Sequence, residues 1–265
     1  MICYTEPSGD AEPAAGGSAN TGGPISAGVV GGPPRAVAVG YFDGLHAGHR
    51  SLLAELRGWA AERGAEPAVV TFDRHPREVL QGRGPQRILS LRHRLVLLAR
   101  EGMAATLCLR FTREMARWSP EEFLDRICRR ALGGRYLLFG FDSAFGRGRS
   151  GTFEHVSSLA PSLGLEVRQA SVERLDGERV SSTLVREAIV SGDLERLARL
   201  LGREYSVVGR VVHGDRRGRT LGFPTANLDV EGAFFPPGGV YFAEARALDG
   251  IPGDSDPSTW NGREI

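Results

Sequence analysis

The segment that constrains this chain most is the run AVAVGYFDGLHAGH at residues 36–49. Its apolar first part is typical of a buried β-strand, and Gly40 predicts a turn directly after it. A helical pattern then begins at His46 and His49, so two imidazoles are expected at a helix N-terminus. Unpartnered N–H groups and the positive end of the helix dipole attract anions there. Gly48 leaves room against the backbone, so the segment predicts a polyphosphate site.

His46 and His49 also allow two simpler interpretations. A zinc site usually takes three or four protein ligands, and no third ligand is evident. A histidine can also merely cap a helix. The strand–turn–helix context favours phosphate chemistry, in which imidazole donors stabilise charge growing at phosphorus, so both histidines are predicted to be catalytic. Asp43, just upstream, is expected to fix the geometry of the turn.

From residue 35 onward, strand-like and helix-like patterns alternate, which predicts an α/β fold with a parallel sheet covered on both faces. Ser119 begins a capping box with proline at the first helical position, and Gly133 with Gly134 closes the helix that follows. Ligands of such sheets bind at the carboxyl ends of the strands, where the histidine turn falls. The strand-like runs are 35–40, 67–72, 105–111, 135–141 and 165–172.

Composition and pattern divide the chain into three parts. Residues 1–34 are rich in Gly, Pro, Ala and Ser and poor in aromatics, so we expect an N-terminal extension that is disordered. Residues 35–203 hold the alternating pattern. Residues 204–265 change to short β segments broken by Gly and Pro, which predicts a small barrel or antiparallel module. These β segments are expected at about 205–213, 221–228 and 239–248.

A second candidate phosphate site lies at residues 180–189. Ser181, Ser182 and Thr183 begin a predicted helix, and the guanidinium of Arg186 lies one turn in on the same face. The same residues are also consistent with an ordinary N-cap serine followed by a surface arginine that binds no ligand. Together with the histidine pair, the segment favours a second group of residues around one triphosphate.

The run GRGRSG at 146–151 fits the pattern GxGxxG of dinucleotide-binding folds. We reject that interpretation because Asp142 to Phe145 separate the run from the preceding strand, and because arginines occupy two variable positions.

Five segments in this order resemble the bacterial bifunctional riboflavin kinase/FMN adenylyltransferase (FAD synthetase) family, which belongs to the HxGH nucleotidyltransferases. The resemblance covers about residues 35–248. It implies a Rossmann-like parallel-sheet nucleotidyltransferase domain over 35–203, followed by a partial β-barrel riboflavin kinase-like module. The segments are HAGH (46–49), VVTFDRHPREVL (69–80), GFDSAFGRGRSG (140–151), VSSTLVREAI (180–189) and GRVVHGDRRGRTLGFPTANL (209–228).

The resemblance implies adenylyl transfer from ATP to FMN with Mg²⁺, giving FAD and pyrophosphate. His46, His49 and Arg186 would be catalytic. Ser143 stands where the family usually has an aromatic residue, and Arg74 where it commonly has proline. The positions implied to bind ATP or FMN are Gly40, Phe42, Asp43, Gly48, His75, Asp142, Phe145, Gly146, Ser181, Ser182 and Thr183.

The C-terminal segment carries the residues of the kinase-like module: Gly214, Gly218, Thr225 and Asn227. A glycine-rich loop can wrap phosphate, and Thr225 with Asn227 can hold Mg²⁺. The family's further strands bring a glutamate base, and this chain stops 24 residues (265 minus 241) past Tyr241. We therefore expect riboflavin kinase activity to be absent. A fragment, a mistranslated end and a degenerate module remain open explanations.

Composition bounds the partners and the compartment. Arg and Lys together number 33 against 32 acidic residues, so no basic footprint for nucleic acid is present. No apolar stretch reaches the length of a membrane span, and the N-terminus has no secretory signal. Of Cys3, Cys108 and Cys128, the last two are expected to be buried thiols, which favours the cytoplasm. We predict small-molecule substrates and no obligate protein partner.

Two alternatives to FMN adenylylation remain. One is a different small-molecule adenylyl- or cytidylyltransferase with the same histidine site. The other is a non-catalytic flavin- or nucleotide-binding remnant, which the short C-terminal module and Ser143 motivate. Product identification separates the first from FMN adenylylation, and binding without pyrophosphate release would mark the second.

Overall fold

A computed structural model describes residues 32–214, 222–223, 225–230, 232 and 234–248, and every structural statement below refers to these. The expected disorder of 1–34 falls outside them except for the last three residues, and so do Cys3 and Gly218.

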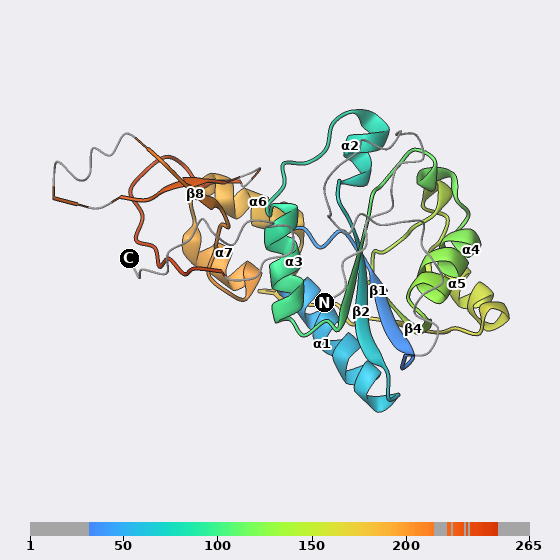
Figure 1. Cartoon of the computed structure of the whole chain (residues 1–265). Helices are drawn as coiled ribbons and strands as arrows, with labels where there is room; N and C mark the ends of the chain where they lie inside the picture. Colours follow the sequence, from blue (N-terminus) through green and yellow to red (C-terminus); the bar gives the residue numbers. More distant parts are fainter. Residues whose placement is uncertain (1–31, 215–221, 224, 231, 233, 249–265) are drawn as a thin grey trace, which may run out of the picture.

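The core of the structure is a five-stranded parallel sheet with the order β3-β2-β1-β4-β5 (Figure 1). Each strand falls on a run predicted from the sequence, so the predicted α/β fold is confirmed. The first strand, β1, lies in the middle of the sheet between β2 and β4, so the order in which successive strands are added reverses beside it. Ligands of such sheets bind at the carboxyl ends of the strands, at this switch point. The bounds are β1 (Arg35–Val39), β2 (Glu66–Phe72), β3 (Ala105–Leu109), β4 (Gly134–Phe139) and β5 (Glu166–Gln169).

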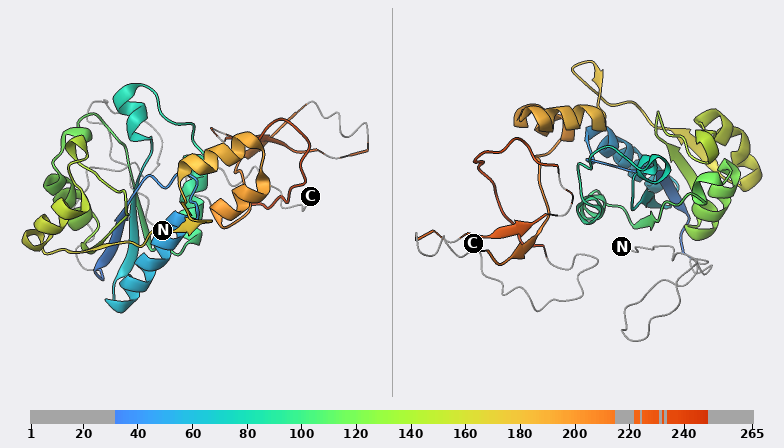
Figure 2. Two further views of the ribbon diagram at one scale, coloured as in Figure 1. Left: turned by 180° about the vertical axis from the view of Figure 1, so that it is seen from behind. Right: turned by 90° about the horizontal axis from the view of Figure 1, so that it is seen from above.

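Two separate cores cover the two faces of this sheet. Side chains alternate along β1, so Ala36 and Ala38 lie in one core and Val37 in the other. One face packs against α1 (Ala47–Glu62), α3 (Leu91–Arg100), α6 (Ser182–Ser191) and α7 (Leu194–Leu201) (Figures 1 and 2). The other packs against α4 (Pro120–Phe123), its π-helical continuation η2 (Leu124–Ala131) and α5 (Phe153–Leu159). Short elements complete this region: α2 (Pro76–Gln81), η1 (Met115–Arg117), η3 (Arg147–Arg149) and η4 (Ala160–Leu163).

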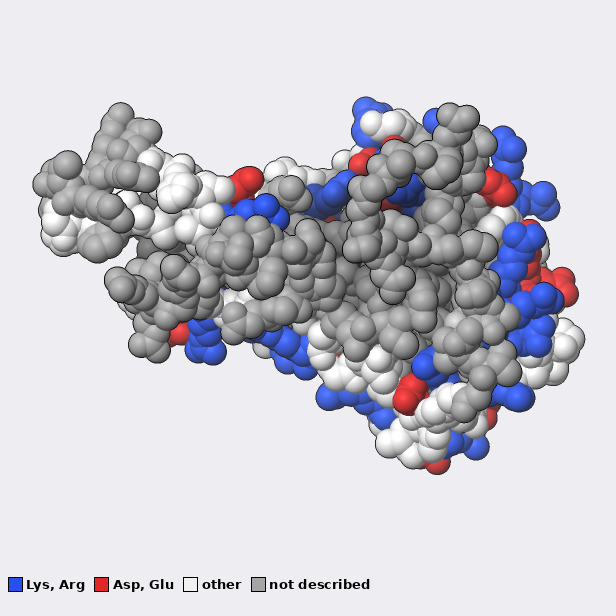
Figure 3. All heavy atoms as spheres, viewed as in Figure 1, with Lys and Arg blue, Asp and Glu red and all other residues white. Residues whose placement is uncertain are grey.

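The capping residues act as predicted at α4. The hydroxyl of Ser119 accepts a hydrogen bond from the N–H of Glu122 at 3.0 Å. The helix ends before Gly133, whose φ of 65° is left-handed. Gly134 already belongs to β4, and a Cβ there would lie 2.6 Å from the Cys128 carbonyl oxygen, so only glycine fits. Charged side chains of both signs mix over α4 and α5 on the face seen in Figure 3.

The C-terminal segments form less regular structure than predicted. Strands β8 (Arg210–Val212) and β9 (Asn227–Asp229) form an antiparallel pair. The prediction of a strand over 239–248 is wrong, because that range has no regular structure. Val240 and Phe242 are almost fully exposed there, and no described strand lies beside them to pair with. A two-stranded hairpin, β6 (Arg174–Leu175) with β7 (Glu178–Arg179), was not predicted.

Cys108 and Cys128 are buried thiols, as the sequence predicted. Burial raises the pKa of Cys128 to about 12, so this thiol stays protonated. Within the described ranges, the helices are all too short or too polar to cross a lipid bilayer.

Candidate active site

The turn between β1 and α1 has an unusual backbone. Phe42 (φ 55°) and Leu45 (φ 41°) are in the left-handed region that non-glycine residues rarely occupy, and Gly44 (φ 82°) lies between them. The buried ring of Phe42 folds back over Gly40, where a Cβ would lie 3.0 Å from the ring. Such strain is characteristic of functional turns held by their surroundings. The turn delivers the chain to the first residue of α1.

The two predicted catalytic histidines are stacked at the start of α1. Their ring centroids lie 3.7 Å apart with an interplanar angle of 19°. His46 caps the helix, and its Nδ1 accepts the N–H of His49 at 3.3 Å. This bond leaves the ring proton of His46 on Nε2. The Nδ1 atom of His49 is buried without a hydrogen-bond partner among the described residues, and its ring meets the ring of Phe42 at 5.3 Å.

Both imidazoles are neutral at physiological pH. Burial, with further contributions from the positive charges of Arg179 and Arg186, lowers the pKa of His46 to about 4. Burial also lowers the pKa of His49 well below its usual value, with smaller contributions from His46 and Arg94. The rings can therefore serve as neutral N–H donors rather than as cations.

These depressed values predict a loss of stability in weak acid. The folded chain keeps His46 and His93 neutral down to a pKa of about 4, whereas the unfolded chain takes up protons near 6.5. Since the unfolded state binds more protons between these values, stability falls as the pH falls through that window. Each of the two histidines should remove about 2 kcal/mol of unfolding free energy between pH 7 and pH 5. Urea denaturation across this range measures it.

The control for this measurement is a variant in which His93→Gln removes one of the titrating groups. Nε2 of His93 lies 3.2 Å from the hydroxyl of Ser206, a contact that a glutamine amide can keep. The slope of stability against pH should decrease in the variant. An unchanged slope, or a flat curve for the parent chain, would contradict the prediction.

The second predicted cluster lies against the histidine turn. Ser181 caps α6 by accepting the N–H of Leu184 at 3.4 Å. The hydroxyl of Ser182 donates to the carbonyl of Asp43 at 2.9 Å, and the hydroxyl-bearing Thr183 is exposed. The two segments, 139 residues apart in sequence, are therefore in direct contact, as one site around a triphosphate requires.

Arg186 is held by the turn rather than free in solvent. Its Nη2 pairs with Oδ2 of Asp43 at 2.5 Å, and its Nε and Nη1 donate to the carbonyls of Gln86 (2.7 Å) and Ser182 (3.2 Å). A guanidinium has five N–H groups, so two remain for a phosphate.

The buried carboxylate of Asp43 joins three segments. Its Oδ1 accepts the N–H groups of Ile88 (3.0 Å) and Leu89 (3.2 Å), while Oδ2 holds Arg186. Asp43 thus acts on more than its own turn, because it also anchors the loop before α3 and the helix α6.

His75 and Asp142 lie on loops at the carboxyl ends of β2 and β4. His75 caps α2, its Nδ1 accepts the N–H of Arg77 at 3.2 Å, and its ring lies edge-on to Tyr41 with centroids 5.0 Å apart. Partial burial lowers the pKa of His75, so Nε2 carries the proton and can donate. The exposed carboxylate of Asp142 forms an ion pair with Arg179, which lies two residues before Ser181.

Phe145 and Gly146 have packing roles that the sequence did not reveal. The partly buried ring of Phe145 lies 5.0 Å from Phe123 and 5.5 Å from Phe139, and it packs against the core on the α4 side of the sheet. A Cβ on Gly146 would lie 2.8 Å from the nitrogen of Pro120. Their described contacts are with this side of the sheet and not with the histidines. The run 146–151 forms a short 3-10 turn and does not open a long helix, in line with the rejected dinucleotide interpretation.

In the C-terminal pair of strands, Gly214 lies against Asn227. A Cβ at Gly214 would fall 2.2 Å from the amide nitrogen of Asn227, so the exposed side chain of Asn227 would have to move to admit one. Thr225 and Asn227 are both exposed to solvent.

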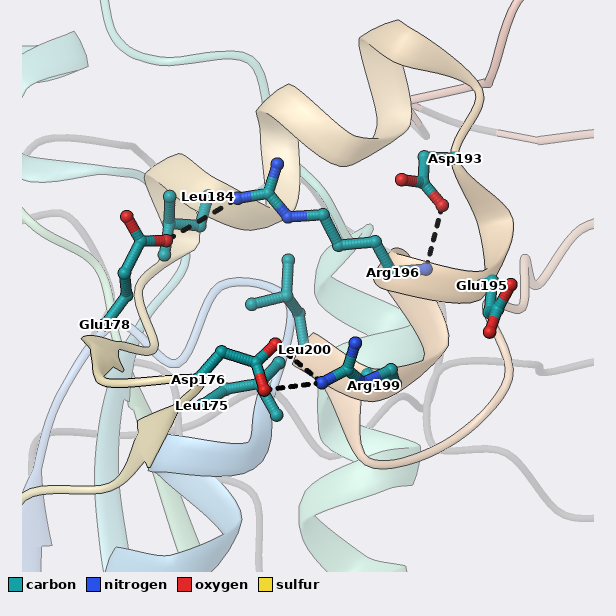
Figure 4. A pocket seen from close by; sticks show the side chains of 9 residues that line it. All are labelled: Leu175, Asp176, Glu178, Leu184, Asp193, Glu195, Arg196, Arg199 and Leu200. Carbon is teal, nitrogen blue, oxygen red and sulfur yellow. Dashed lines mark hydrogen bonds and ion pairs between the residues drawn. The ribbon is translucent and has the colours of Figure 1, made fainter.

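A cavity of about 430 Å³ lies between the β6–β7 hairpin and α7 (Figure 4). Its charged groups satisfy one another: Asp176 accepts two hydrogen bonds from Arg199 (2.8 and 2.6 Å), and Glu178 pairs with Arg196 at 3.7 Å. Neither His46 nor His49 lines it, so we assign it no substrate. The lining residues are Leu175, Asp176, Glu178, Leu184, Asp193, Glu195, Arg196, Arg199 and Leu200.

A parallel α/β sheet with paired imidazoles at the first strand–helix turn defines the nucleotidyltransferase class. Family sequence profiles agree: the profile described as FAD synthetase matches residues 32–184, and the profile described as riboflavin kinase matches 201–260. The chain belongs to the bifunctional riboflavin kinase/FMN adenylyltransferase family, and it carries the family's FAD synthetase domain.

Relatives and a solved structure support this membership. The enzyme of that name from Pseudomonas fluorescens is 38% identical over 224 residues, which are 84% of this chain and 70% of the relative. Its counterpart from Escherichia coli K12 is 36% identical over 217 residues, 82% and 69% of the two chains. A crystal structure from Streptococcus pneumoniae named as a macrolide-efflux protein superposes with a TM-score of 0.68 and 31% identity, covering 80% of this chain and 70% of that one.

Sequence reasoning missed several residues that shape this site: Tyr41, Gln86, Ile88, Arg94 and Arg179. The sequence held a signal for one of them, because Arg94 falls on the apolar face of its helix between Leu91 and Leu98.

Proposed function

We propose that this chain transfers the adenylyl group of ATP to FMN and releases pyrophosphate. An FMN phosphate oxygen attacks the α-phosphorus of ATP while the bond from that phosphorus to the pyrophosphate oxygen breaks, so no covalent enzyme intermediate is needed. The observation that carries the proposal is the contact between the two predicted clusters, in which Ser182 and Arg186 bind Asp43 in the turn that leads to the stacked histidines. Family membership supports the two substrates.

Each group would have one role in the transfer. Nε2–H of His46 and the ring of His49 would donate to the phosphate oxygens, and a well-aimed donor of this kind contributes about 3 kcal/mol to transition-state stabilisation. The free N–H groups at the start of α1 would bind the same oxygens. The hydroxyls of Ser182 and Thr183 and the two free N–H groups of Arg186 would hold the rest of the triphosphate. His75 and Asp142 are proposed to contact the flavin or the nucleotide.

Magnesium would enter this site as the ATP complex. No group of three His, Cys, Asp or Glu residues that could hold a metal is found in the described ranges, and the carboxylate of Asp43 is already engaged. Mg²⁺ commonly keeps several waters and binds mainly through substrate phosphates, which fits this set of residues. In the C-terminal module, Thr225 and Asn227 are proposed as its oxygen ligands.

A substitution at Gly48 tests the approach of the phosphate to the helix. The backbone of Gly48 is not left-handed, and a Cβ would lie 3.5 Å from the Val180 carbonyl and 3.3 Å from the His46 ring, a tight contact that a shift of a few tenths of an ångström relieves. Gly48→Ala should therefore leave the melting temperature within a few degrees. FAD formation should fall about 10-fold or more, because the methyl group occupies the path of the phosphate. Steady-state rates and thermal melting measure both effects.

The matched control is Gly58→Ala in the same helix, where nothing lies within 4 Å of the new Cβ. This variant should keep full activity. A Gly48→Ala enzyme with unchanged turnover would contradict the proposed path.

The test of the function is direct. Purified protein is incubated with FMN, ATP and Mg²⁺, and the products are separated by chromatography while pyrophosphate is measured. FAD and pyrophosphate are expected in equal amounts. Absence of FAD even at high enzyme concentration overturns the proposal; flavin or nucleotide binding without pyrophosphate release would identify a non-catalytic remnant. CTP and other phosphorylated acceptors test the rival transferases.

The same assay with riboflavin in place of FMN measures the second activity of the family. The expected absence of riboflavin kinase activity stays a prediction that this assay tests. We also propose a cytoplasmic location, which the buried thiols Cys108 and Cys128 support.

A further inference from the structure

Arg94 is a buried cation that the transfer reaction described above does not use. It lies on α3, and only 1% of its surface is exposed. Its Nη1 donates to the carbonyl of Tyr41 at 2.9 Å and its Nη2 to the carbonyl of Phe72 at 2.5 Å. The guanidinium also lies 4.2 Å from the centre of the Tyr41 ring. Because these carbonyls follow β1 and end β2, Arg94 ties together the two strand ends that carry the histidine turn and the His75 loop.

The charge of Arg94 is not neutralised in the described structure. No described carboxylate forms an ion pair with it, and its Nε is buried without a hydrogen-bond partner. Arg35 provides the contrast within the same fold. It is also buried (6% exposed), but it lies at the opposite end of β1 and pairs with Glu66 at 3.2 Å.

An unpaired buried charge is unfavourable unless something compensates it. The carbonyls of Tyr41 and Phe72 and the tyrosine ring offset part of the cost for Arg94 through dipoles and a cation–π contact. The guanidinium lies at the ends of β1 and β2 that carry the histidine turn and the His75 loop. The charge of Arg94 acts on His49, because it is one of the causes that lower the pKa of this histidine.

We propose that Arg94 is a positioning residue that holds the ends of β1 and β2 and supplies a fixed positive charge to the polyphosphate of ATP behind His49. This inference rests on the proposed function, because it assumes that the polyphosphate binds at the histidine turn. It gives a reason for a charge at this buried position: the phosphate is the anion that Arg94 otherwise lacks. A low-dielectric surrounding keeps such an interaction strong although the two groups are not in contact.

Three variants separate charge from packing. Arg94→Met removes the charge and keeps a chain of similar length. Arg94→Lys keeps a cation when the pH is below its pKa, which burial lowers, and it cannot bridge two carbonyls in the same way. Arg35→Met removes a buried arginine at the far end of the sheet. Calorimetry with ATP and with inorganic tripolyphosphate gives affinities that do not depend on turnover, and urea denaturation gives stability.

All three variants should be less stable than the parent chain. Arg94→Met should bind both polyphosphates about 10-fold more weakly or worse, whereas Arg94→Lys should stay close to the parent. Arg35→Met should bind normally. Unchanged affinity in a folded Arg94→Met variant would overturn the proposal. So would a loss in Arg94→Lys or in Arg35→Met as large as the loss in Arg94→Met. If the parent chain binds polyphosphate but forms no FAD, the proposed function fails and this inference is still tested.

The composition allows a second, direct measurement. The chain contains no lysine, so Arg94→Lys introduces the only lysine side chain in the protein. With ¹³C-labelled lysine, the spectrum contains one lysine spin system, whose side-chain shifts report its surroundings. These shifts should move as tripolyphosphate is added. If they stay constant while binding is saturated, the introduced charge does not sense the phosphate and the inference is wrong.

Discussion

Replacement of His49 by alanine is expected to lower the rate of FAD formation about 10²–10³-fold, the loss typical of one well-aimed donor in a transition state. The melting temperature should change little. The N–H of His49 that caps against Nδ1 of His46 belongs to the backbone and remains in the variant. Nδ1 of the ring has no described hydrogen-bond partner, so its loss leaves no partner unsatisfied. Initial rates with FMN and ATP, together with thermal melting, measure the two effects.

His93 provides the matched control for His49. Burial lowers its pKa to about 4 as it does for His46, but the described contact of its ring is with the hydroxyl of Ser206 and not with the histidine pair. His93→Ala should lose stability and keep its rate per folded molecule. If His49→Ala instead unfolds in step with its loss of activity, His49 is a structural residue and the proposed role is wrong.

The second large effect is expected at Arg186. Arg186→Gln should reduce kcat/KM for ATP about 10²-fold, because charge-assisted bonds to the phosphates are lost. It should also destabilise the fold by about 3 kcal/mol, since the carboxylate of Asp43 is left buried without its partner. Steady-state kinetics and urea denaturation give the two numbers.

A double variant separates these two consequences. In Asp43→Asn with Arg186→Gln, the amide oxygen can still accept the N–H groups of Ile88 and Leu89, and no buried charge remains. Stability should return to near that of the parent, while activity stays low. Recovery of activity together with stability would show that Arg186 acts only through its ion pair with Asp43.

Much of the fold follows from local patterns. The strands of the parallel sheet could be predicted because apolar runs bounded by glycine and proline record burial on both faces. The capping residues Ser119 and Ser181 could be predicted because a cap satisfies N–H groups only three residues away. The strand expected over 239–248 failed for the opposite reason. A strand needs a partner, and pairing is not a local property of the segment.

The candidate site shows the same division between near and distant contacts. The residues of the two predicted phosphate clusters, the histidine turn and the segment 180–189, could be recognised in the sequence because each cluster lies within one short segment. The ion pair between Asp43 and Arg186 joins residues 143 positions apart, and the bond from Arg94 to the Tyr41 carbonyl spans 53. No local pattern records such contacts. Phe145 shows the converse, because this position of the family signature is partly buried and packs against the core.

The sequence by itself determined the alternation of strands and helices, the turn at His46 and His49 and the hydroxyl-rich start of α6. Hydrogen bonds and burial within a few residues leave a regular spacing in the chain, which is why these features could be read directly. Only the tertiary structure decided that Arg186 is held by Asp43, that both imidazoles are neutral and that an unpaired arginine lies behind them. These properties depend on which distant groups exclude water from one another, because burial sets the cost of a charge and packing sets its partners.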